Sequence, residues 1–172
     1  RYSLARTDYN SPVDIDLDLL ASHSNDNPVY YVQYAHARSC NVDRNAAAAN
    51  ITREDADLSL LDTEADGEVL ALLAQWPAAL AQAGDMRAPH RVAHYLEDLS
   101  AAYHKWYNVE RVVPVALTEP EERADEATRE ATRIAKCPEP ARSAARLRLN
   151  DAVQTVIAVG LDLLGVSAPD KM

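Results

Sequence analysis

The sequence contains no phenylalanine, only four glycines and only two cysteines among its 172 residues. So little glycine leaves few positions for loops that cradle phosphate or expose a nucleophile, and neither a Gly-rich phosphate loop nor a GxSxG motif occurs. Cys40 and Cys137 lie far apart without a CxxC partner, which argues against a disulfide scaffold and favours a reducing compartment. There is no signal peptide and no run of about 18 apolar residues. We therefore expect a soluble, cytoplasmic protein with no membrane partner.

Basic residues are also in the minority, since 17 Lys and Arg stand against 27 Asp and Glu and give a net charge of −10. This balance argues against non-specific binding to nucleic acid or to anionic membranes, although a local basic patch remains compatible with it. Hydrophobic residues make up 48% of the chain, and many of them are alanine. Alanine favours helices and is depleted in strands, so we expect an all-α bundle of about five or six helices.

Residues 1–26 begin without Met, and we expect them to be the end of an upstream domain or a connector. Apolar and acidic residues alternate within 11–20, which predicts a short strand or an extended connector. A helix is predicted from Asn27, a good N-cap followed by Pro28 at the first helical position, to about Asn50.

Further helix starts are predicted at Thr52, with Asp55 three residues later, and at Thr63, with Asp66 three residues later. Pro77 is expected to bend or end the second of these helices, and the next helix should begin at Pro89 after a break at Gly84. In that helix, residues 92, 96, 99 and 103 recur on one face.

The β-branched run 111–117 is interrupted by Pro114 and is predicted to be a connection. Residues 118–141 are highly charged and bounded by prolines, so we expect an exposed helix on an excursion from the bundle. A final helix is predicted from the apolar stripe that includes Leu149, Val153 and Ile157, and Gly165 should end it.

Aromatic residues concentrate in the stretch NPVYYVQYAHAR, residues 27–38. On a helix, Tyr31, Tyr34 and Arg38 fall within a sector of about 60°, whereas Tyr30 and His36 should point elsewhere and contact neighbouring helices. Two phenol rings beside a guanidinium suit an unpaired RNA base, which the rings stack against while Arg binds phosphate or a base edge. Half-buried tyrosines that only pack the helix remain an open alternative.

Two histidine pairs have the spacing of a metal site. His90 and His94 are four residues apart, but Arg91 stands where a zinc hydrolase motif requires Glu, and no third ligand is evident. His36 and Cys40 share this spacing, with no better support. Arginines also cluster near the start of the last helix, where they are either ordinary surface charge or contacts to an RNA backbone: Arg142, Arg146 and Arg148.

Four stretches, in the same order, resemble the C-terminal anticodon-binding domain of the arginyl-tRNA synthetase family. NPVYYVQYAHAR resembles the start of that domain, and SPVDIDLDLLASHSNDNP (11–28) resembles the stem that leads into it. HRVAHYLEDLSAAYHKWYN (90–108) resembles its later helix, and ARLRLNDAVQTVIAVGLDLLGVSAPDKM (145–172) resembles its final helix and terminal Met. The resemblance covers nearly the whole chain and is weakest near 119–140.

The resemblance implies a helical bundle, residues 27–172, that binds the anticodon stem and loop of an arginine tRNA, preceded by the end of a catalytic domain or its stem in 1–26. It implies a parent enzyme that uses ATP and arginine, with an upstream catalytic domain of the same polypeptide. The HIGH and KMSK motifs of that domain are absent here, so we expect no catalytic residue, cofactor or metal in this chain, and no DNA partner.

Position by position, the resemblance implies that Tyr31, Tyr34 and Arg38 face the anticodon arm. It places Tyr107 near the anticodon bases and Met172 close to the anticodon loop. Arg111 stands where some relatives carry Trp, and a guanidinium can also stack on a base. Without the resemblance, two alternatives remain: a helical module that binds another protein through its 90–107 face, and a metalloenzyme that uses His90 and His94.

Overall fold

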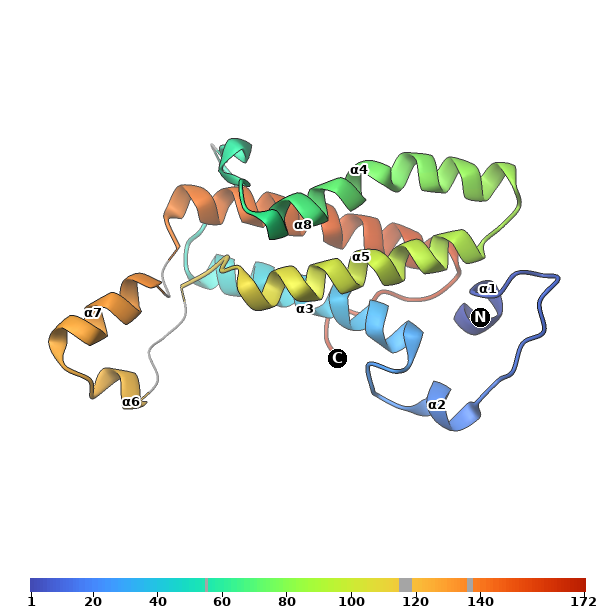
Figure 1. Ribbon diagram of the computed structural model, residues 1–172, viewed down its shortest axis with the longest axis horizontal. Helices are drawn as coiled ribbons and strands as arrows, with labels where there is room; N and C mark the ends of the chain where they lie inside the picture. The colour runs from blue at the N-terminus through green and yellow to red at the C-terminus, as the bar shows by residue number, and fades with distance from the viewer. Residues whose placement is uncertain (55, 115–118, 136–137) are drawn as a thin grey trace.

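The computed structural model describes residues 1–54, 56–114, 119–135 and 138–172, and this part of the chain is helical with no strand. Its long helices lie alongside one another as a bundle (Figure 1), which confirms the predicted all-α architecture. None of the described helices is both long enough and apolar enough to cross a membrane. The long helices are α3 (Pro28–Ala48), α4 (Glu64–Asp85), α5 (His90–Val109) and α8 (Pro140–Leu163). The short ones are α1 (Tyr2–Ala5), α2 (Leu17–Ala21), η1 (Leu58–Leu60), α6 (Glu119–Glu122) and α7 (Glu126–Ala135).

The core lies where α5 contacts α3, α4 and α8. The predicted stripe of α5 faces inward, since Val92 is 5% exposed and Leu96, Leu99 and Tyr103 are fully buried. Burial of such large side chains is the main favourable contribution to folding. The same face is therefore occupied inside the bundle and offers no free surface to a protein partner.

Residues 11–16 form an extended connector rather than a strand. The connector ends at Asp16, whose carboxylate accepts hydrogen bonds from the backbone N–H groups of Asp18 and Leu19 and caps α2. This local capping converts the end of the alternating segment into a helical turn, which the alternation alone did not predict.

Helix α3 begins as predicted, with Asn27 at the N-cap position and Pro28 as its first residue. The Asn27 side chain does not cap the helix, however. Its amide donates to the backbone carbonyl oxygens of Leu20 and Ser22, at 3.0 and 2.9 Å, and so fastens the connector to the start of α3.

The capping box predicted for α4 is confirmed, because the Thr63 hydroxyl accepts from the Asp66 N–H and the Asp66 carboxylate accepts from the Thr63 N–H. Pro77 does not end this helix, which continues to Asp85. No helix starts at Thr52, which lies in an irregular segment, and Asp55 lies outside the described residues.

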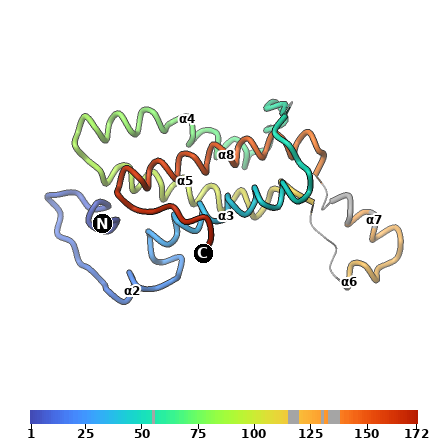
Figure 2. The backbone as a smooth tube through the Cα atoms, turned by 180° about the vertical axis from the view of Figure 1, so that it is seen from behind, coloured from blue at the N-terminus to red at the C-terminus, as the bar shows by residue number. Residues whose placement is uncertain are grey.

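The charged segment after α5 holds α6 and α7, two helices where one was expected, and they project from one end of the bundle (Figures 1 and 2). Part of that segment, and the end of the predicted connection at 115–117, lies outside the described residues. Helix α8 ends at Leu163, and Gly165 follows with φ +67°, a left-handed conformation that glycine adopts without strain. Beyond Gly165 the chain turns back and ends beside α3 (Figure 2).

Candidate nucleic-acid interface

Tyr30, Tyr34 and Arg38 form a ridge along α3 at spacings of four residues. The rings of Tyr30 and Tyr34 stack with centroids 6.1 Å apart, and Arg38 Nη2 donates to the Tyr34 hydroxyl at 3.0 Å. Side chains four apart on a helix are separated by only about 40°, which explains why Tyr30 joins Tyr34. The prediction that Tyr30 points elsewhere was therefore wrong.

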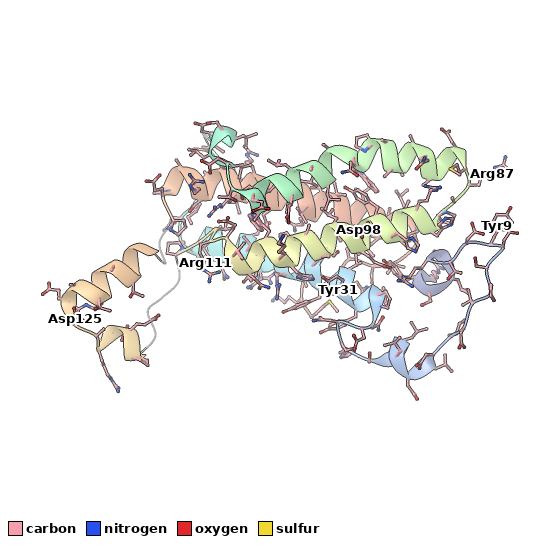
Figure 3. The ribbon with its side chains drawn as sticks, in the orientation of Figure 1. Tyr9, Tyr31, Arg87, Asp98, Arg111 and Asp125 are labelled. Atoms are coloured by element: carbon pink, nitrogen blue, oxygen red, sulfur yellow. The ribbon has the colours of Figure 1, made fainter. Side chains whose placement is uncertain are left out.

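Tyr31 lies on the side of α3 that faces α5 (Figure 3). It is half-buried, and its ring centroid lies 4.7 Å from that of His104 on α5. Burial raises the pKa of the Tyr31 phenol, and the positive charge of Arg38 partly opposes this shift. Tyr31 thus packs against α5 behind the ridge, whereas Tyr34 and Arg38 form part of the ridge itself.

A cavity of about 490 Å³ lies beside the ridge. Four residues that the sequence singles out from separate segments line it together: Tyr34 and Arg38 from α3, Tyr107 from α5, and Met172 at the chain terminus. The other lining residues are Ala37, Asn41, Arg44 and Lys171.

Sequence reasoning missed Asn41, Arg44 and Lys171. Asn41 follows Arg38 by three residues, so continuing the helical face past Arg38 would have found it. Arg44 follows by six residues, about 120° round the helix from Arg38, so that face does not predict it. Lys171 is next to the predicted Met172, but no local signal shows that the terminus reaches α3.

Arg38 sits between two rings, with its Cζ 4.7 Å from the centroid of Tyr34 and 4.5 Å from that of Tyr107. Its Nη1 donates to His104 Nδ1 at 2.9 Å. Arginine has no acceptor, so His104 Nδ1 accepts and the ring proton resides on Nε2, which donates to the Tyr31 carbonyl oxygen at 3.4 Å. Burial, and then the charge of Arg38, lower the pKa of His104 to about 4, so this imidazole is neutral at pH 7.

The last residues of the chain are fastened along α3 by polar side chains. Gln33 donates to the Ser167 carbonyl oxygen at 2.8 Å, His36 Nδ1 lies 3.0 Å from the Pro169 carbonyl oxygen, and Arg44 donates to the Asp170 carbonyl oxygen at 3.3 Å. His36 thus contacts the terminal segment rather than the neighbouring helix that was expected. These bonds place Lys171 and Met172 at the cavity.

Within the described residues, one trio of side chains brings metal-ligand atoms within 4.8 Å of one another, namely His36, Cys40 and Asp170. Each has a partner within the protein, since Cys40 Sγ accepts from Gln154 and lies 3.7 Å from the Asp170 carboxylate. Burial and the Asp170 charge raise the pKa of the Cys40 thiol, which disfavours the thiolate that metals prefer. The trio therefore joins the terminus to α3.

His90 and His94 are not part of this trio. Their ring centroids lie 6.0 Å apart in an edge-to-face contact at the start of α5, and His90 Nδ1 lies 3.9 Å from the Asp8 carboxylate. No third ligand-type atom completes a cluster with the pair in the described part of the chain.

The arginines proposed as backbone contacts lie away from the cavity. Arg142 donates to the Leu60 carbonyl oxygen and pairs with Asp62, at 2.7 and 2.6 Å. Arg148 is exposed and lies beside Arg53 in a separate hollow.

Arg146 is 5% exposed, and its guanidinium contacts the carboxylates of Asp66 and Glu110. A cation enclosed in this way cannot reach an RNA backbone, so we do not retain Arg146 as a candidate contact. Arg111 is exposed at the end of α5 nearest the α6–α7 excursion (Figure 3), and it does not line the cavity.

Comparison with known proteins links this geometry to a family. The sequence model of the DALR anticodon binding domain matches residues 32–172. The chain is 86% identical over its full length to "Arginine--tRNA ligase" of Bifidobacterium animalis subsp. lactis and covers 29% of that protein. It is 81% identical to the protein of the same name from Bifidobacterium adolescentis and covers 28% of it. The chain thus spans less than a third of the length of these curated relatives.

Solved structures agree with the sequence comparison. A Campylobacter jejuni structure named as an arginyl t-RNA synthetase superimposes with a TM-score of 0.75 at 25% identity, over 99% of this chain and 32% of that one. Thermus thermophilus arginyl-tRNA synthetase gives a TM-score of 0.67 at 28% identity, over 99% of this chain and 25% of that one. From its sequence and its fold, the chain belongs to the DALR anticodon binding domain family.

Proposed function

We propose that this chain binds the anticodon stem and loop of an arginine tRNA through the cavity between α3, α5 and the C-terminal residues. The observation that carries the proposal is the convergence of Tyr34, Arg38, Tyr107 and Met172, from three segments, around one cavity. Membership of an anticodon-binding family and high identity to ligases named for arginine and tRNA supply the class of ligand.

The lining residues suit an unpaired nucleotide. Arg38 covers one face each of the Tyr34 and Tyr107 rings, so a base splayed out of the loop stacks on a ring face that stays uncovered or on the guanidinium plane itself. Arg38 lies between these rings, and the N–H groups that it does not use on His104 and Tyr34 suit a phosphate or a base edge. Arg44 and Lys171 add positive charge at the same cavity, although the chain as a whole carries −10.

In the parent protein, the role of this chain is to position the tRNA for an upstream catalytic domain of the same polypeptide, which joins arginine to the tRNA in the cytoplasm. ATP and arginine are ligands of that domain, and this chain contributes no catalytic group. The purified chain should therefore bind tRNA without aminoacylating it.

Anisotropy of a labelled anticodon stem-loop tests the proposal. Trp106 is 1% exposed and hydrogen-bonded to Asp66, so tryptophan emission is a poor reporter and the label belongs on the RNA. Tyr34→Ala and Tyr107→Ala should each weaken binding by about 1–3 kcal/mol, because each removes a stacking surface.

Tyr9→Ala is the matched control, since Tyr9 is 89% exposed at the far end of the bundle (Figure 3) and should not change affinity. A stem-loop with the middle anticodon cytosine replaced should bind more weakly than the unaltered one. Full affinity in both cavity variants, with helicity retained by circular dichroism, would contradict the proposed site.

A further inference from the structure

We propose that His104 is a positioning residue that holds Arg38 at the cavity without compensating its charge, so that the full positive charge is available to a phosphate of bound RNA. The inference rests on the proposed function and assigns a role to a residue that lies behind the cavity. His104 acts through Arg38, since it is 9% exposed and does not itself line the cavity.

The first support is the neutrality of the acceptors that hold Arg38. Its guanidinium donates to His104 Nδ1 at 2.9 Å and to the Tyr34 hydroxyl at 3.0 Å. Among the described residues, no carboxylate forms an ion pair with Arg38. Other arginines of the same chain do contact carboxylates, including Arg6, Arg53, Arg142 and Arg146.

This difference matters because acidic residues are plentiful here, 27 against 17 basic ones. A carboxylate at position 104 would orient Arg38 equally well but would neutralise it. A neutral imidazole gives a directed acceptor with no opposing charge. The hydrogen bond from His104 Nε2 to the Tyr31 carbonyl oxygen fixes the tautomer that makes Nδ1 the acceptor.

Arg44 and Lys171 are cations that line the same cavity as Arg38. Arg44 Nη1 donates to a backbone carbonyl oxygen, that of Asp170, at 3.3 Å. Neither Arg44 nor Lys171 forms an ion pair with a carboxylate in the parts of the chain that the structure describes. Arg38 and Arg44 are thus oriented by neutral groups, as expected of a site for RNA phosphates.

The test compares His104→Asn with His104→Asp. Asn places an amide oxygen close to the position of Nδ1 and should keep Arg38 both oriented and uncompensated. Asp places a carboxylate there and should keep Arg38 oriented but neutralised. The measurement is the affinity for the anticodon stem-loop over a series of salt concentrations at pH 7, with thermal unfolding of each variant as the check on folding.

We expect His104→Asn to match the unaltered chain in affinity and in salt dependence. His104→Asp should bind about tenfold more weakly at low salt, and its slope of log K against log[salt] should be shallower by about 0.7, the value for one phosphate contact to a single strand. A role confined to stability would leave the slope the same in both variants, and that result would overturn the proposal.

If His104→Asp does not fold, Arg38→Gln takes its place in the test. It removes the same charge while leaving amide donors for His104, so it should reproduce the shallower slope, and an unchanged slope would again overturn the proposal. If the folded, unaltered chain does not bind the stem-loop, the proposed function fails. Inorganic tripolyphosphate, which requires only charge, then decides the role of His104: binding weakened by His104→Asp supports it, and equal binding overturns it.

Discussion

Arg146 and Arg148 lie two residues apart on α8 in opposite surroundings. Arg146 contacts the carboxylates of Asp66 and Glu110, and Asp66 is fully buried, whereas Arg148 is exposed. Arg146→Ala leaves interior carboxylates without their cation and should lower the free energy of unfolding by about 3–5 kcal/mol. Arg148→Ala, the matched control, should change it by less than about 0.5 kcal/mol. Urea denaturation followed by circular dichroism measures both, and equal losses would contradict the ion-pair assignment.

The pH dependence of the free energy of unfolding tests whether the fold keeps the single residue His104 neutral. In the folded protein the pKa of the His104 imidazole is lowered from the ordinary 6.5 to about 4. Between pH 4 and pH 6.5 the unfolded chain therefore binds a proton on His104 that the folded chain does not. The contribution of His104 to the free energy of unfolding is therefore complete above about pH 6.5. As the pH falls toward 4, up to about 3 kcal/mol of it is lost. The groups that face His104 are the Arg38 cation and the rings of Tyr31, Tyr34 and Tyr103.

Subtracting the stability curve of His104→Asn from that of the unaltered chain isolates this contribution. The difference should be flat above about pH 6.5 and should change as the pH falls. A difference that stays flat down to about pH 4 would show that His104 is not held neutral by the fold.

At the scale of the helices, the contact between α5 and α8 depends on Gly160. A Cβ at this position would lie 2.6 Å from Leu96 Cδ2, and Leu96 is fully buried. Gly160→Ala should therefore cost about 1–3 kcal/mol in overpacking, more than the roughly 1 kcal/mol that alanine gains in helix propensity.

Gly67→Ala on α4 is the control for that prediction, because a Cβ there meets no atom within 4 Å. This variant should be stabilised by about 0.5–1 kcal/mol from propensity alone. Thermal unfolding measures both changes. The prediction fails if Gly160→Ala is as stable as Gly67→Ala.

The long helices were largely predictable from sequence, and the exception at Pro77 has a tertiary cause. The capping box at Thr63 and the glycine after α8 mark helix ends that the structure confirms. Of the two outcomes expected at Pro77, a bend or an end of α4, the end is excluded because the helix continues to Asp85. The packing of α4 against α5 stabilises the helix on both sides of Pro77. A rule that considers only the sequence around a proline does not include this packing energy.

For the whole molecule, the net charge of −10 bears on selectivity. An acidic surface repels RNA in general, so only a ligand that reaches the cations of the cavity gains from binding. Asp85, Glu122 and Glu126 are exposed, and Asp85→Asn/Glu122→Gln/Glu126→Gln removes three negative charges. The triple variant should bind an unrelated RNA hairpin about two- to fivefold more tightly at low salt, and the cognate stem-loop should gain no more than that. Unchanged affinity for the unrelated RNA in an anisotropy assay would contradict this role of the acidic surface.

The sequence by itself determined the helical class, most ends of the long helices α3, α4, α5 and α8, and the grouping of Tyr34 and Arg38, because helical periodicity and capping act within a few residues. Tertiary structure decided which of these residues are available to a ligand. Tyr31 faces His104 rather than the cavity, Arg146 is enclosed by carboxylates, and Lys171 joins the cavity by way of the terminal segment. The reason is physical: burial and charge pairing depend on which faces of distant helices meet, and a local pattern contains no information about that.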